Sequence, residues 1–88
     1  MEYNAILIDP NDNVAIVVVE TKKGQTINGI GIGEIAAKED IPCNHKIAVN
    51  TIPENTPVTK YGHTIGLAKA MIEPGRWVNA HNIKPAKG

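Results

Sequence analysis

Three blocks in the second half of the chain gather residue types that transfer protons or bind small anions. They read Ile41-Pro-Cys-Asn-His-Lys-Ile-Ala-Val49, Val58-Thr-Lys-Tyr-Gly-His-Thr-Ile-Gly66 and Ile72-Glu-Pro-Gly-Arg-Trp-Val-Asn-Ala-His-Asn82. Each block places polar side chains beside a turn signal, in a stretch that otherwise favours β-strand. A small β-domain with such loops is expected to present these groups to another molecule.

The histidines of these blocks are His45, His63 and His81. Histidine titrates near neutrality and ligates metals, so it suits acid–base work or a metal site. None of the three belongs to a local zinc-binding spacing, so a metal site would have to be assembled in space. Taken singly, each is more often a surface or hydrogen-bonding residue.

Cationic and hydroxyl groups accompany the histidines. Lys46, Lys60, Tyr61 and Arg76 could orient the carboxylate or hydroxyl groups of a small anionic substrate. The alternative for Lys60 is a solvated strand face. The carboxylates are scattered and form no convincing acid–base pair, so residue chemistry alone gives no complete catalytic apparatus.

Three further residues are harder to assign. Trp77 follows a Pro-Gly turn and begins an apolar strand, which favours a core anchor over a ligand platform. Cys43 is the single cysteine, so no intrachain disulfide can form, and a catalytic thiol lacks an evident orienting group. Asn82 could cap a turn, pair or bind.

The composition restricts the class of protein. The chain has 88 residues, no net charge and no phenylalanine, so we expect one domain with a thin core of Ile, Val and Ala. Nucleic acid and membrane surfaces are disfavoured because no basic stripe exists, and no apolar run approaches ~20 residues. The N-terminus lacks the basic region of a signal peptide, so a cytoplasmic protein is expected.

Short strands punctuated by turns must position these groups. Strands are predicted over 5–9, 14–20, 46–50, 58–61, 64–71 and 77–82, and the single helix candidate, 34–40, is a turn or two at most. The segment 25–33 is rich in glycine but lacks the spacing of a dinucleotide fingerprint. We interpret it as a kinked strand that another backbone approaches closely. Residues 1–84 form one domain, and 85–88 a flexible tail.

A short internal sequence repeat supports the prediction of strands separated by turns. Ile41-Pro-Cys-Asn44-His-Lys-Ile47, Ile52-Pro-Glu-Asn55-Thr-Pro-Val58 and Ile72-Glu-Pro-Gly75-Arg-Trp-Val78 align without gaps. Each predicts a β-turn in which Asn or Gly adopts positive φ, followed by a strand.

The three blocks resemble the SAF-type domain of the altronate and galactarate dehydratase family, a module that also occurs as a free small subunit, including in sulfolactate sulfo-lyase. The resemblance implies a mostly β, β-clip fold of short twisted strands. It also implies a large catalytic partner subunit, a sugar-acid substrate and Fe²⁺ or another divalent metal, held mainly by that partner. A homo-oligomer is left open.

Residue by residue, the resemblance makes His45 and His81 the candidate catalytic residues and metal ligands. It makes Lys46, Tyr61, Gly62 and Asn82 the candidate substrate-binding residues. Asn44 stands where the family has glycine, and Asn79 where it has the first of two histidines.

The implied function is that of a hydro-lyase small subunit acting on altronate or galactarate by metal-assisted β-elimination, inactive by itself. Two alternatives remain: the small subunit of a sulfolactate sulfo-lyase, and a non-catalytic module that binds a small anion or a protein.

Overall fold

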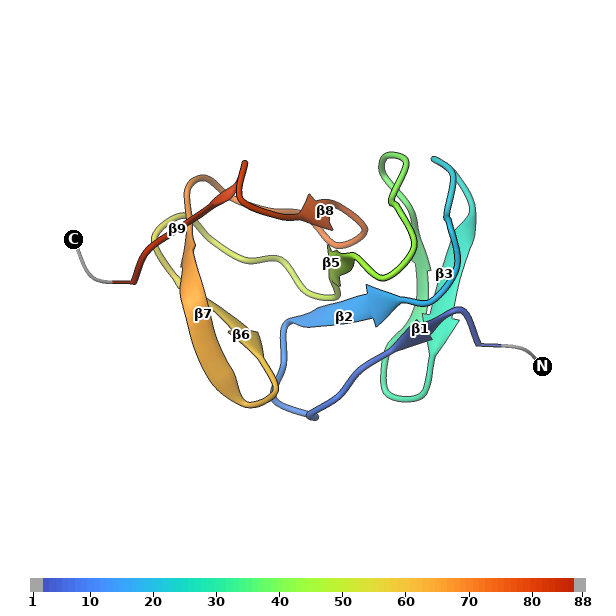
Figure 1. The fold of residues 1–88 in the computed structure, drawn as a ribbon, viewed down its shortest axis with the longest axis horizontal. Coiled ribbons are helices and arrows are strands. Elements are labelled where there is room, and N and C mark those ends of the chain that lie inside the picture. Colours follow the sequence, from blue (N-terminus) through green and yellow to red (C-terminus); the bar gives the residue numbers. More distant parts are fainter. Residues whose placement is uncertain (1–2, 87–88) are drawn as a thin grey trace.

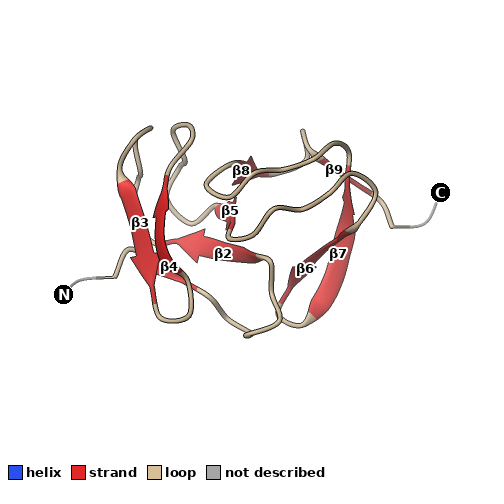
Figure 2. Cartoon of the chain, turned by 180° about the vertical axis from the view of Figure 1, so that it is seen from behind, coloured by secondary structure: helices blue, strands red, loops and turns tan. Residues whose placement is uncertain are grey.

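The computed structural model describes residues 3–86, and every regular element in that range is a strand (Figures 1 and 2). The strands are β1 Ala5–Ile6, β2 Val14–Val17, β3 Thr26–Gly29, β4 Gly33–Ala36, β5 Lys46–Ala48, β6 Pro57–Lys60, β7 His63–Ala68, β8 Trp77–Val78 and β9 Ile83–Lys84. The predicted class, a mostly β domain of short strands, is confirmed. No helix long and apolar enough to cross a membrane occurs over this range.

Three small sheets build an elongated molecule of 42 × 23 × 18 Å. A central antiparallel sheet has the order β1-β2-β5-β8, the β3–β4 hairpin lies at one end, and β6-β7-β9 lies at the other (Figure 1). The two ends of the described chain point away from each other along the long axis. The central sheet therefore joins two outer units and contains part of two polar blocks, in β5 and β8.

Two apolar clusters flank the central sheet. Successive residues of a strand face opposite sides, so β5 directs Ile47 into one cluster and Ala48 into the other. Both clusters consist of β-branched residues and alanine, as the composition predicts. The aromatic Trp77 is only partly buried and packs against the first cluster, which agrees with the anchor interpretation.

The second half of the fold repeats the first. Core residues of one cluster have counterparts in the other 31 positions further along the chain, as with Ile27 and Val58, or Ile41 and Ile72. The isolated bridges obey the same relation, since Thr21 pairs with Ile41 and Ile52 pairs with Ile72. The fold thus contains two copies of one turn–hairpin–turn unit, sharing the central sheet.

The predicted turns adopt the expected backbone. Asn44, Asn55 and Gly75 have φ of 68°, 66° and 90°. A fourth copy, which the sequence comparison missed, runs over 21–27 and places Gly24 at φ 89°. It carries neither proline nor an aliphatic first residue, so its sequence signal is weak.

Three element predictions are wrong, the helix candidate entirely and two strand predictions in part. The helix candidate 34–40 begins as strand β4, because Gly31 and Gly33 at φ 83° and 76° turn the chain back to pair with β3. The glycine-rich segment is therefore a hairpin, although its predicted close approach is confirmed: a Cβ at Gly29 would collide with the Ala5 carbonyl oxygen. The strand predicted over 77–82 ends at Val78, where a turn begins.

Of the predicted tail, 85–88, the structure describes Pro85 and Ala86. Both follow β9, are exposed and belong to no strand. Residues 87–88 lie outside the described range.

Candidate functional site

Trp77 contacts both candidate catalytic histidines. Its indole Nε1–H donates a hydrogen bond of 3.1 Å to Nδ1 of His45. The His45 ring meets the indole edge-on, with centroids 5.4 Å apart and planes at 70°. The indole also contacts the tilted ring of His81, at a centroid distance of 5.3 Å. The structure thus brings His45 and His81 together through Trp77, which sequence reasoning had assigned to packing alone.

A tight turn presents His81. The backbone N–H groups of Asn82 and Ile83 both donate to the Asn79 carbonyl, at 3.0 and 3.1 Å. The Asn82 side chain closes the turn from both ends, accepting from the Asn79 N–H at 2.9 Å and donating to the Trp77 carbonyl at 2.8 Å. Both polar atoms of Asn82 are therefore engaged with the backbone, and its evident role is to hold the loop that carries His81.

His81 opens onto a cavity of about 390 Å³. Its lining consists of Glu39, Lys69, Ala70, Met71, Ile72, Glu73, Arg76, His81 and Asn82. The volume lies within the ~300–1,000 Å³ of small-molecule sites. The cavity is partly open to solvent.

Ion pairs organise the wall of this cavity. Arg76 lies 4.0 Å from Glu39 and 3.6 Å from Glu73. Glu39 also accepts a 3.0 Å hydrogen bond from the Trp77 backbone N–H. Glu39 thereby fixes both Arg76 and the first residue of β8. No local sequence signal points to Glu39, because its partners lie more than 35 positions away along the chain.

A second polar group contains Lys46, Lys60 and Tyr61. The Lys60 ammonium lies 4.8 Å from the centroid of the Tyr61 ring, within cation–π range. Burial, and secondarily the nearby charge of Lys60, lower the pKa of Lys46 from its ordinary value of 10.5. Both effects disfavour the ammonium form of Lys46. An anion bound beside the two lysines would offset their mutual repulsion and favour that form, and the anion would be stabilised in turn.

Asp12 holds the turn that carries Tyr61. Its carboxylate is 3% exposed and accepts from the N–H groups of Tyr61 at 2.9 Å, Gly62 at 2.8 Å and Asp9 at 3.2 Å. Tyr61 and Gly62 have φ of 56° and 76°, as in a type I′ hairpin turn. Positive φ is unfavourable for tyrosine, so the buried carboxylate stabilises a strained turn. The sequence alone assigned no role to Asp12.

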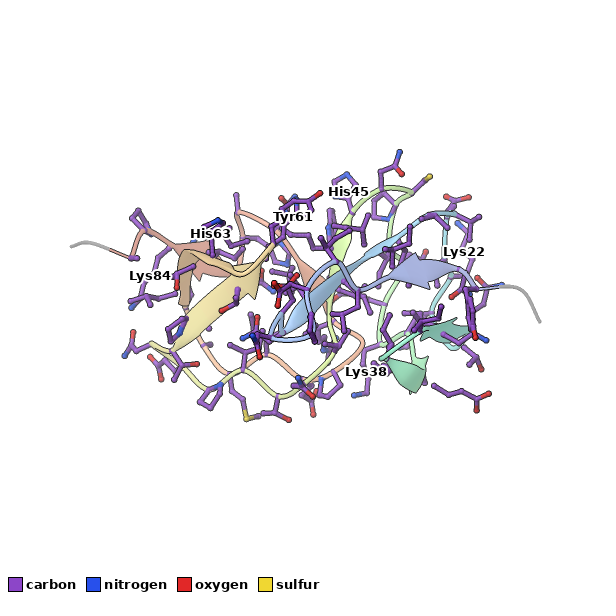
Figure 3. All side chains as sticks on the ribbon, turned by 90° about the horizontal axis from the view of Figure 1, so that it is seen from below. Lys22, Lys38, His45, Tyr61, His63 and Lys84 are labelled. Atoms are coloured by element: carbon purple, nitrogen blue, oxygen red, sulfur yellow. The ribbon has the colours of Figure 1, made fainter. Side chains whose placement is uncertain are left out.

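The two polar groups lie on opposite faces of the central sheet, although His45 and Lys46 are consecutive residues. Trp77 and Ile47 are cross-strand partners, so the histidine–tryptophan group lies over the Ile47 face of the sheet. Lys46 precedes Ile47 and points to the other face. Figure 3 shows that His45, Tyr61 and His63 nevertheless project from the same long side of the molecule, whereas Lys38 lies on the opposite side.

The donor set of this chain does not fit a metal ion by itself. Among residues 3–86, no three His, Cys, Asp or Glu side chains are grouped so that they could hold one. The Nδ1 atom of His45 is engaged by an N–H donor, which leaves no lone pair there for a metal. The described residues of this chain therefore do not supply a complete ligand set for a metal ion.

The remaining candidates lie apart from this arrangement. His63 is exposed and pairs with Lys60 across the β6–β7 hairpin. Cys43 is exposed at the turn before His45, with its Sγ 3.3 Å from the Val18 carbonyl oxygen.

Residues 3–86 match the family model of the altronate/galactarate dehydratase SAF domain. The chain is 38% identical over 79 residues to an altronate dehydratase of Bacillus subtilis (strain 168), covering 90% of this chain and 16% of that protein. It is 32% identical over 90 residues to the (2R)-sulfolactate sulfo-lyase subunit alpha of Chromohalobacter salexigens, covering 96% of each. A galactarate dehydratase (L-threo-forming) of Escherichia coli (strain K12) is 34% identical over 79 residues, and this chain spans 14% of it.

Proposed function

Because this chain belongs to the SAF domain family of altronate and galactarate dehydratases, we propose that it serves as the small subunit of a hydro-lyase that dehydrates a sugar acid. The observation that carries the proposal is the family match over residues 3–86, together with the partly open cavity beside His81. The main catalytic site lies on a larger chain, since this chain spans only 16% of the altronate dehydratase it resembles.

The proposed reaction is a β-elimination. A base removes the proton from the carbon next to the carboxylate, and the hydroxyl group on the neighbouring carbon takes up a proton and departs as water. The resulting enol then tautomerises to a 2-oxo acid. The substrate is a polyhydroxylated anion, so it requires cations and hydrogen-bond donors that approach from more than one side.

In this scheme the polar residues of the chain bind the substrate or exchange a proton with it. Lys46 and Tyr61 bind oxygen atoms of the substrate, while His81, exposed on its turn, is the group best placed to exchange a proton with it. Fe²⁺ or another divalent ion, held mainly by the larger chain, would supply Lewis-acid chemistry in the assembled enzyme.

A second candidate substrate is sulfolactate, from which sulfite instead of water would leave the carbon next to the one deprotonated. The observation in its favour is that the chain aligns with 96% of a sulfolactate sulfo-lyase subunit alpha.

The test is a pulldown of the tagged chain from its native host, with the purified complex assayed on altronate, galactarate and sulfolactate in the presence of ferrous iron. We expect a stoichiometric larger chain, lyase activity in the complex and none in the isolated 88-residue chain. Preferred turnover of sulfolactate would select the second candidate. A monomer without a partner, or a chain that binds an anion without any lyase activity, would refute the proposal in favour of a binding module.

A further inference from the structure

The hydrogen bond between Trp77 and His45 fixes the protonation pattern of the imidazole. The indole Nε1–H is a donor only, so the atom it contacts at 3.1 Å, Nδ1 of His45, must carry a lone pair. A neutral imidazole with a lone pair on Nδ1 bears its single proton on Nε2. His45 therefore directs an N–H group, and not a lone pair, away from Trp77.

We propose that Trp77 is a positioning residue that holds His45 as the neutral Nε2–H tautomer, so that His45 acts as a hydrogen-bond donor to an oxygen atom of a carboxylate or enediolate. In this state His45 is neither a general base nor a metal ligand.

The surroundings of the indole support a fixed orientation. Trp77 is anchored at its backbone by Glu39, paired with Ile47 across β5 and β8, and in contact with the His81 ring. The ring is partly buried against the first apolar cluster. A side chain held at these points keeps its N–H directed at one acceptor, so the tautomer of His45 is determined before any ligand arrives.

The arrangement is the reverse of the usual metal-binding histidine. A histidine that ligates a metal donates its other ring N–H to a carboxylate, carbonyl or water, which keeps the ligating nitrogen free of a proton. Here the second ring nitrogen accepts instead. A neutral imidazole N–H can polarise a carbonyl or enediolate oxygen without transferring its proton, and the proton transfer is left to another group.

The tautomer can be measured in the isolated chain, independently of the proposed function. Long-range ¹H–¹⁵N correlation spectra of ¹⁵N-labelled protein should show an unprotonated Nδ1 and a protonated Nε2 for His45, while the exposed His63 serves as the control with mixed tautomers. Trp77→Phe removes the donor and should give His45 the mixed pattern of His63. If that variant does not fold, slow exchange of the Trp77 indole proton and its scalar coupling to His45 Nδ1 in the wild type provide the second measurement. A protonated Nδ1, or no coupling to Trp77, overturns the proposal.

The donor role rests on the proposed function and needs the assembled lyase. His45→Ala should lower kcat/KM by about 10²–10³-fold, the usual effect of removing one preorganised oxyanion donor. His45→Gln, whose amide can donate near the position of Nε2, should recover activity to within about tenfold of the wild type. Equal losses in both variants would refute the donor role and indicate a base or ligand, whereas absence of lyase activity in the wild-type complex would refute the proposed function.

Discussion

The buried carboxylate of Asp12 gives the sharpest prediction for the candidate site. Asp12→Asn keeps the shape of the side chain but replaces one acceptor oxygen by an NH₂ group. Oδ2 serves the N–H groups of Tyr61 and Asp9, whereas Oδ1 serves only that of Gly62. The least damaging orientation of the amide therefore directs its NH₂ towards Gly62. The Gly62 N–H then has no acceptor, and the hydrogen bonds from the Tyr61 and Asp9 N–H groups go to a neutral oxygen instead of a charged one.

The magnitude follows from these contacts. A hydrogen bond to a charged group contributes about 1.5–3 kcal/mol, and a buried donor left unpaired costs about 1–3 kcal/mol. We expect Asp12→Asn to lower the free energy of unfolding by about 2–3 kcal/mol. At ~0.05–0.15 kcal/mol per residue, a domain of this length has a total of only about 4–13 kcal/mol.

The assay is urea denaturation, with amide hydrogen exchange at Tyr61 and Gly62 as the local readout. Both amides should lose protection in Asp12→Asn. The matched control is Glu54→Gln at an exposed turn, which should change the free energy of unfolding by less than about 0.5 kcal/mol. If Asp12→Asn also stays within 0.5 kcal/mol of the wild type, the carboxylate does not hold the Tyr61 turn.

Three further predictions concern the turns, the lysine group and the exposed histidine. Gly75→Ala should destabilise the fold by several kcal/mol more than Gly24→Ala, because both residues have φ near 90° but only a Cβ at Gly75 meets a backbone atom, the Ala36 carbonyl oxygen. Equal melting temperatures for the two variants would contradict this packing. The pKa of Lys46 is lowered in the folded chain, so over a range of pH below 10.5 the unfolded chain keeps a proton that the folded chain has released. The contribution of Lys46 to stability therefore increases as pH rises from the folded pKa towards 10.5. Lys60→Gln should raise the pKa of Lys46 in an NMR titration of its Cε, though not fully to 10.5, since burial remains the larger cause. His81→Ala should leave the melting temperature within a few degrees of the wild type while impairing the assembled lyase; a large drop in melting temperature with unchanged activity per folded complex would show that His81 is structural.

Local chemistry accounts for what the sequence predicted about the fold. Proline followed by Asn or Gly predicts turns with positive φ, and the β-branched run after Asn13 predicts a strand, because both signals depend only on neighbouring residues. The helix candidate 34–40 failed for the opposite reason. Its alanines favour a helix by intrinsic propensity, but pairing with β3 across the hairpin decides the conformation.

The sequence also identified the family, since three ordered motifs carry the resemblance. It could not show that Trp77 connects His45 to His81, because residues 45 and 77 become neighbours only when β5 pairs with β8. For the same reason the roles of Asp12 and Glu39 were invisible: each contacts backbone groups more than 35 positions away.

The sequence by itself therefore determined the strand-rich class, the three turns at Asn44, Asn55 and Gly75, and the chemical groups available for a site. Only the tertiary structure decided how those groups are used. It commits Asn82 to a turn, assigns the Nε2 proton to His45, and separates Lys46 from the histidines although it is the next residue to one of them. The physical reason is that hydrogen bonding and burial depend on contacts across strands, whereas turn and strand preferences are set within a few residues of chain.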